Sequence, residues 1–179
     1  MSLQTERLIL RPWQLSDAED LYEYAKSPEV GPIAGWKPHE SVAESAEIIR
    51  TVFSQPQVYA VVLKETNQAI GCIGLLDAQA SNFVIGGNDA EVAYWIGVPY
   101  WGKGLIPEAL TQLINYAFSD LELDNLWCGY YADNQKSHRA QEKCGFQFQR
   151  TEENKFNPFL NDYRTEHITR LTKQEWLAR

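Results

Sequence analysis

Residues 94–110, YWIGVPYWGKGLIPEAL, constrain the fold most strongly, because an apolar strand-like run passes through two glycines into a helical pattern. Pro107 is tolerated there because it falls in the first helical turn. Backbone N–H groups at such a turn point toward one spot, where the positive end of the helix dipole favours an anion. We expect a pyrophosphate cradle formed by the amides of Gly102, Lys103, Gly104 and Leu105. An ordinary strand-to-helix turn is the alternative that the glycines alone leave open.

Other glycine-rich phosphate motifs fit this turn less well. The segment GKGLIPEA lacks the third glycine of a dinucleotide-binding fingerprint, and it lacks the GxxxxGK[ST] spacing of a P-loop. Neither class of nucleotide-binding protein is therefore indicated.

The rest of the chain predicts alternating strands and helices in the order β-α-α-β-β-β-α-β-α-β-β. The proline-rich stretch 28–39 is expected to be a structured loop, and Asn134 is expected to cap a helix that ends at Cys144. We expect one α+β domain over residues 1–179 with helices on both faces of its sheet. The expected strands are 8–10, 58–64, 69–76, 90–98, 125–131, 146–150 and 164–171, and the expected helices are 16–28, 41–55, 106–118 and 134–144.

Composition and charge exclude several classes of protein. The 44% hydrophobic content of the 179 residues suffices for a sizeable core. A net charge of -8, from 16 Lys and Arg against 24 Asp and Glu, has the wrong sign for nucleic-acid binding. Three cysteines without CxxC spacing indicate neither disulfides nor a metal site. With no signal peptide or membrane span in the sequence, we expect a cytoplasmic protein that does not bind membranes.

The GKG turn resembles the Q/R-x-x-G-x-G/A motif of the GNAT acetyltransferase superfamily, whose amides bind the pyrophosphate of acetyl-CoA. Asn134 and Ser137 resemble the N-x-x-S of the RimJ/RimL-like branch, the ribosomal-protein N-terminal acetyltransferases and their relatives. The K-x-G-F that begins at Lys143 and the terminal LTKQEW strengthen the resemblance, which covers nearly the whole chain. Pro99 departs from the motif, because it stands where the leading Gln or Arg is expected.

The resemblance implies a central, mostly antiparallel twisted sheet of about seven strands, with the fourth (90–98) and fifth (125–131) splayed apart. It also implies acetyl-CoA as co-substrate, with the pantetheine arm paired to backbone around residues 95–98, and no metal is expected beside it. The expected cofactor-binding residues are Trp95, Ile96, Gly97, Val98, Gly102, Lys103, Gly104, Leu105, Asn134, Ser137 and Lys143.

Acetyl transfer to an amine needs a proton acceptor and a proton donor for the departing thiolate. Glu91 is expected as the base, directly or through water, because the resemblance places a carboxylate near the acceptor amine. Ser137 is expected as the acid. A solvated strand-end charge at Glu91 and simple helix capping by Asn134 and Ser137 remain open alternatives. Tyr131 and Tyr163 are weaker candidates for the acid.

Two further groups of residues could contact the substrates. Lys136, Arg139 and Lys143 share a helix face and, with Lys103 and His138, would suit a 3′-phosphate, although a solvated face fits them equally well. Trp36 and Tyr163 are expected near the acceptor, with loop anchoring as the alternative for Trp36.

The resemblance predicts an N-acetyltransferase that moves acetyl from acetyl-CoA to a primary amine by direct attack. The acceptor is a peptide or protein N-terminus or a small-molecule amine, and the negative surface favours cationic acceptors without naming one. A non-catalytic acyl-CoA sensor and an enzyme that uses another acyl-CoA are the alternatives. A homodimer is compatible with the sequence.

Overall fold

A single eight-stranded sheet runs through the protein, whose computed structural model describes residues 1–179. Its strand order is β1-β2-β3-β4-β5-β6-β8-β7, and all neighbours are antiparallel except the parallel pair β5 and β6. The strands are β1 (Leu3–Gln4), β2 (Leu8–Pro12), β3 (Val58–Leu63), β4 (Gln68–Leu76), β5 (Asp89–Ile96), β6 (Asn125–Tyr131), β7 (Gln147–Asn157) and β8 (Asp162–Thr172).

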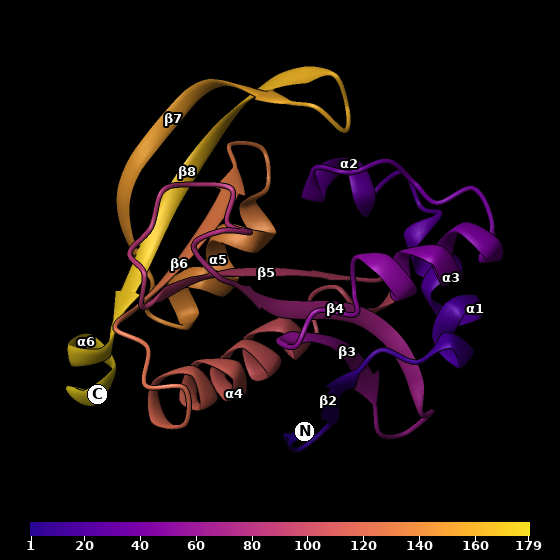
Figure 1. Ribbon diagram of the computed structural model, residues 1–179, viewed down its shortest axis with the longest axis horizontal. Helices are drawn as coiled ribbons and strands as arrows, with labels where there is room; N and C mark the ends of the chain where they lie inside the picture. Colours follow the sequence, from indigo (N-terminus) through magenta and orange to yellow (C-terminus); the bar gives the residue numbers. More distant parts are fainter.

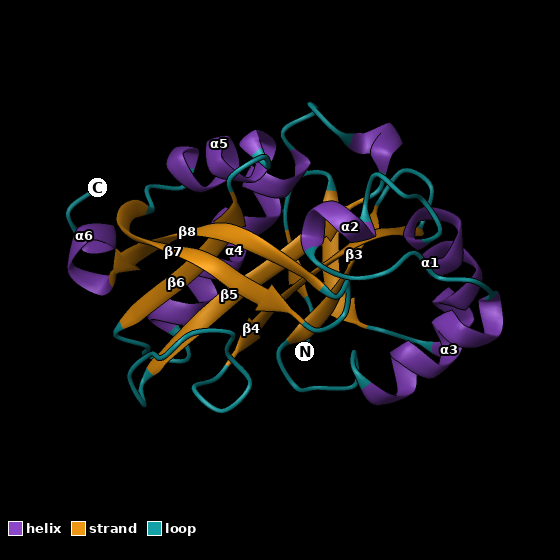
Figure 2. Cartoon of the chain, turned by 90° about the horizontal axis from the view of Figure 1, so that it is seen from above, coloured by secondary structure: helices purple, strands orange, loops and turns teal.

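Helices cover both faces of the sheet, as the α+β prediction requires (Figures 1 and 2). One apolar cluster joins α4 and α5 to one face, and a second joins α1 and α3 to the other face of β3 and β4. None of the helices is long and apolar enough to cross a membrane. The helices are α1 (Ala18–Ala25), α2 (Gly31–Ala34), α3 (Val42–Thr51), α4 (Leu105–Ser119), α5 (Gln135–Lys143) and α6 (Lys173–Leu177).

The predicted splay between the fourth and fifth expected strands, now β5 and β6, is confirmed. Residues 89–92 of β5 pair with 125–128 of β6, but 93–96 and 129–131 do not pair with each other. β5 stays on β4 through Ile96, while β6 stays on β8 through Tyr131. The sheet therefore splits in its middle, immediately after Val92 and Cys128.

The proline-rich stretch was predicted as loop throughout, and that is wrong for α2. Pro32 occupies the first turn of this short helix, where its missing N–H costs nothing, and Gly35 ends the helix with φ 100°. In Figure 1, α2 lies on the same side of the sheet as the far end of the β7–β8 hairpin.

The C-terminal third is more regular than predicted. β7 and β8 form a long hairpin, although strands of only 146–150 and 164–171 were expected. Register shifts after Phe148 and Glu152 interrupt the inside-outside alternation of β7, which hid its length. The LTKQEW segment forms the end of β8 and α6, whose start is fixed by a capping box between Thr172 and Glu175.

Candidate active site

The glycine turn enters α4 with an open surface. Gly104 is the N-cap of α4, and both Gly102 and Gly104 have positive φ, 72° and 73°, which favours glycine. A Cβ at Gly102 would meet nothing within 4 Å, and one at Gly104 would meet only Arg7 Nη2, at 3.7 Å. The turn therefore lets an anion approach the first amides of a 15-residue helix.

Arg7 braces this turn, a role that sequence reasoning missed. Its Nη1 donates to the Lys103 carbonyl at 2.9 Å, and its Nε lies 2.7 Å from Glu108 Oε2. Burial alone would raise the pKa of Glu108, but hydrogen bonds from Thr5 and Arg7 hold it below its ordinary value. No local pattern links Arg7 to Glu108, because the sheet brings them together across 101 residues.

The split leaves backbone polar groups of β5 without a strand partner. Gly97 N–H donates to Ile70 of β4, so strand alternation directs the groups of Tyr94 and Ile96 toward β6. Trp101 Nε1 donates a hydrogen bond to the Ile96 carbonyl at 3.0 Å. The backbone groups of β5 that stay unpaired at the split are therefore the N–H and carbonyl of Tyr94 and the N–H of Ile96. Gly97, one of the residues expected to pair with the pantetheine arm, has no free backbone group, because its N–H donates to Ile70 and its carbonyl accepts from the Tyr100 N–H.

Ser137 faces the split from α5. The Asn134 side chain caps the helix by accepting from the Ser137 backbone N–H at 3.2 Å, so the predicted cap is confirmed and the Ser137 hydroxyl is left for other contacts. That hydroxyl lies 2.8 Å from Tyr94 Oη and accepts from Gln141 Nε2 at 3.1 Å. Burial raises the pKa of Tyr94 well above its ordinary value. Tyr94 was not among the expected side chains.

Glu91 is buried, with only 4% of its surface exposed, so the solvated strand-end alternative is wrong. Its carboxylate accepts from Ser81 Oγ at 2.8 Å, Asn82 N–H at 2.6 Å and Asn82 Nδ2 at 3.0 Å. Burial raises the pKa of Glu91, against the lowering effect of these donors. A carboxylate has about four acceptor positions, so about one stays open for a water or a proton.

Glu91 and Ser137 flank the split from opposite faces of the sheet. Tyr94, which contacts Ser137, is three residues beyond Glu91, and successive side chains of a strand alternate between faces. A group threaded between β5 and β6 would therefore have the carboxylate on one side and the hydroxyl on the other.

Of the two expected acceptor-side residues, Trp36 lies on the face that carries Glu91, whereas strand alternation along β8 puts Tyr163 on the opposite face. Trp36 stacks edge-on against Trp95 with ring centroids 5.6 Å apart, as a loop anchor would. Asn157 Nδ2 donates to the Gly35 carbonyl at 2.9 Å and ties the β7–β8 hairpin to this loop. Tyr163 is 70% exposed. It borders a pocket of about 370 Å³ lined by Tyr131, Ala132, Asp133, Asp162, Tyr163, Arg164 and Thr165.

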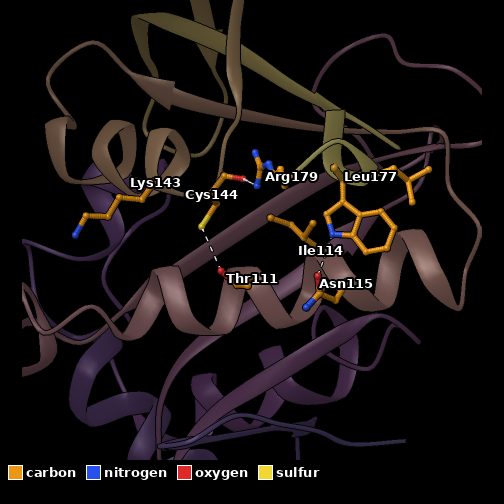
Figure 3. Close-up of a pocket in the computed structure, with 8 residues that line it drawn as sticks. Thr111, Ile114, Asn115, Lys143, Cys144, Leu177 and Arg179 are labelled. Atoms are coloured by element: carbon orange, nitrogen blue, oxygen red, sulfur yellow. Dashed lines mark hydrogen bonds between the residues drawn. The ribbon is translucent and has the colours of Figure 1, made fainter. Parts of the chain in front are cut away.

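The basic residues that were expected to share one face do not lie together in the structure. Lys136 Nζ lies 3.4 Å from the centroid of Trp101 and Lys103 Nζ 5.7 Å from that of Tyr100, both beside the glycine turn. Lys143 instead ends α5 at the rim of a separate pocket of about 560 Å³ (Figure 3). Thr111 and Arg179 both contact Cys144 there. Lys143 extends away from these side chains in Figure 3. It is the last residue of α5, at the opposite end of the helix from the Asn134 cap and Ser137.

No group of three or more His, Cys, Asp and Glu side chains is arranged to hold a metal ion.

Comparison with known proteins gives the family. Residues 7–147 match the family described as acetyltransferase (GNAT) domain. An uncharacterized N-acetyltransferase, p20 of Bacillus licheniformis, is 30% identical over 151 residues, which cover 82% of each chain.

Solved structures show the same fold at lower identity. A GNAT-family acetyltransferase from Bacillus anthracis superposes with a TM-score of 0.82 at 19% identity, covering 98% of this chain and all of the other. The ribosomal-protein-S5-alanine acetyltransferase from Vibrio fischeri superposes with a TM-score of 0.73 at 19% identity and covers 98% of both chains. The chain therefore belongs to the GNAT family of acetyl-CoA-dependent N-acetyltransferases, and it resembles the RimJ/RimL-like branch of that family.

Proposed function

We propose that residues 1–179 form one catalytic domain that transfers acetyl from acetyl-CoA directly to a primary amine, without a covalent enzyme intermediate. The observation that carries this proposal is the open split between β5 and β6, with Glu91 on one face, Ser137 on the other and the glycine turn beside it.

The residues present fit acetyl-CoA. At Gly102 and Gly104 the space that a Cβ would fill is open except for the tip of Arg7, and Arg7, Lys103 and Lys136 bring positive charge beside the turn for a pyrophosphate. The unpaired backbone groups of Tyr94 and Ile96 can take the amides of the pantetheine arm. Asn134 and Ser137 at the start of α5 complete the proposed contacts, whereas Lys143 lies at the wrong end of that helix to join them.

The chemistry balances with the groups at the split. The amine nitrogen attacks the thioester carbon, a C–N bond forms and the C–S bond breaks. The proton lost by nitrogen passes through water to Glu91, whose raised pKa makes it a better acceptor than an ordinary carboxylate. The departing thiolate takes the Ser137 hydroxyl proton, which the neighbouring Tyr94 hydroxyl replaces before solvent restores it.

The acceptor is a primary amine, either the N-terminus of a peptide or protein or a small molecule. An α-amine has a pKa of about 7.7 to 8.0, so an appreciable fraction is already neutral near physiological pH, whereas lysine is almost fully protonated. A modest base such as Glu91 therefore suits an α-amine. The Vibrio fischeri neighbour is named for acetylating the alanine of a ribosomal protein, which supports a protein N-terminus as a class to test.

The testing experiment is calorimetric titration with acetyl-CoA, followed by measurement of thiol release with a panel of amines and peptide N-termini. We expect binding and amine-dependent release. Binding without release from any amine would favour the sensor alternative, and absence of binding would overturn the cradle. Titration with longer acyl-CoAs in competition tests the choice of donor.

A further inference from the structure

Glu166 is a second buried carboxylate on the face that carries Glu91. It lies on β8 opposite Tyr131, and only 10% of its side chain is exposed. Lys155 Nζ contacts its Oε2 at 2.7 Å. The same ammonium lies 3.2 Å from Glu152 and donates to the Asn82 carbonyl at 3.1 Å, so three oxygens surround it.

The other oxygen of Glu166, Oε1, has no donor within the protein. Only two side-chain polar atoms, Trp13 Nε1 and Arg170 Nε, are both fully buried and without a hydrogen-bond partner. Glu166 Oε1 is not one of them, so its surface is not fully enclosed. Oε1 is therefore still reachable from outside. An unpaired, nearly buried carboxylate oxygen is costly unless something pairs with it, because burial removes most of its water.

This oxygen lies directly over the split. A Cβ on Gly129 would stand 2.3 Å from Glu166 Oε1 and 3.3 Å from the Phe83 ring. Gly129 is the first residue of β6 after its pairing with β5 ends. A side chain at position 129 would lie on the same face of β6 as Trp127, and Trp127 is paired in register with Glu91. Glycine at 129 thus makes room for a carboxylate where the strands part.

The charge around Oε1 favours a cation. Glu166 pairs with the half-buried ammonium of Lys155, and Glu152 pairs with both Lys155 and Arg150. Glu91 is near enough for the Glu166 charge to raise its pKa but pairs with no cation, which leaves an excess of negative charge. Phe83 adds an aromatic ring whose centroid is already 5.3 Å from Lys155 Nζ.

We propose that Glu166 Oε1, with the Phe83 ring, is the binding site for the primary ammonium of the acceptor, at the Glu91 side of the split. The role of this ammonium as acceptor rests on the proposed acetyl transfer. Glu166 would hold the incoming ammonium, which releases one proton to solvent before the neutral amine attacks. The second proton, lost as the C–N bond forms, passes to Glu91, and Lys155 would keep the Glu166 carboxylate in place.

The test compares Glu166→Gln with Glu153→Gln, which removes one charge from the same hairpin at an exposed residue without a side-chain hydrogen bond or ion pair. We expect Glu166→Gln to raise the amine KM at least about tenfold, the effect of losing one charge-assisted hydrogen bond. The Kd for acetyl-CoA should stay unchanged. Glu153→Gln should leave both constants within about twofold. An unchanged amine KM in Glu166→Gln would overturn the proposal while leaving acetyl transfer intact.

Direct binding separates this site from turnover. Ligand-observed NMR on the protein without acetyl-CoA should detect binding of alanine amide to wild type, weaker binding to Glu166→Gln and none of the uncharged N-acetylalanine amide. This pattern would support the site even if no amine is acetylated. Equal binding of the amide to wild type and Glu166→Gln, or no binding to wild type, would contradict it.

A second variant covers the case in which Glu166→Gln does not fold. Gly129→Ala keeps every charge. Its methyl group would displace Glu166 Oε1, because a methyl carbon and a carboxylate oxygen cannot lie only 2.3 Å apart. It should raise the amine KM as Glu166→Gln does, with the Kd for acetyl-CoA unchanged. Normal KM in a folded Gly129→Ala would overturn the placement of the ammonium at Oε1.

Discussion

The hydroxyls of Tyr94 and Ser137 lie 2.8 Å apart and connect β5 to α5 beside the split between β5 and β6. Gln141 donates to the same serine oxygen at 3.1 Å and to the Gly129 carbonyl of β6 at 3.1 Å. Ser137 is thus held by both sides of the opening, which fixes its hydroxyl where a thiolate would leave.

Removal of this hydroxyl should affect rate more than binding. We expect Ser137→Ala to lower kcat by about a hundredfold or more, the usual size of a general-acid contribution. The Kd for acetyl-CoA should change little, because Asn134 caps α5 through the Ser137 backbone and the cap survives. Steady-state kinetics with calorimetry measure both constants, and exposed Ser16→Ala is the matched control. A full kcat in Ser137→Ala would remove the serine from the chemistry.

Gly104→Glu should abolish acetyl-CoA binding. The substitution places a side chain with negative charge on a residue with φ 73°, at the mouth of the proposed cradle. Gly87→Glu makes the same change at an exposed glycine with open space around it and should bind normally. Calorimetric titration of both variants decides the point, and unchanged affinity in folded Gly104→Glu would refute the cradle.

Loss of Arg7 should weaken acetyl-CoA binding by a moderate factor. The side chain is 43% exposed, so we expect Arg7→Gln to cost about three- to tenfold in Kd, up to ~1.4 kcal/mol. Because Glu108 positions the guanidinium, Glu108→Gln and the double variant should be non-additive with it. Additive losses in this double-mutant cycle would show that the two residues act separately.

Glu91 should give stability a particular pH dependence. A carboxyl whose pKa is raised by folding binds its proton more tightly in the folded state. Its contribution is therefore fully present below the ordinary carboxyl pKa and is lost as pH rises through the raised value. Relative to Glu91→Gln, the wild type should lose stability as pH rises from about 4, the ordinary carboxyl pKa, through the raised pKa of Glu91. Chemical denaturation of both proteins across this range measures the difference, and a difference that grows in favour of wild type would contradict the raised pKa.

The same substitution should change the acid limb of the rate profile. If Glu91 accepts the amine proton, kcat of wild type should fall at low pH as the carboxyl is protonated, at a pH above the ordinary glutamate range. Glu91→Gln should be slower and lack this limb. Persistence of the limb in Glu91→Gln would assign it to another group.

Local signals made the central elements predictable from sequence. The glycine turn, the Asn134 cap and the β-rich runs act within a few residues, and the family resemblance supplied the splay that these signals do not contain. The interior bulges of β7 have no such signal, so its length was missed.

The site was less predictable because its side chains meet across the sheet. Glu91 and Ser137 were reached through the resemblance. Tyr94 could have been found from strand alternation, since it falls on the face opposite Glu91. The contacts of Arg7 with Glu108 and of Lys155 with Asn82 join segments 101 and 73 residues apart, and only the packing of a helix and a loop against the folded sheet brings them together.

The most direct test of the account is amine-dependent release of CoA thiol from acetyl-CoA, with the N-acetylated product identified by mass spectrometry. The account predicts one acetylated amine for each thiol released by wild type, and none above background by Gly104→Glu. Thiol release that is independent of amine, or equal in the two proteins, would contradict it.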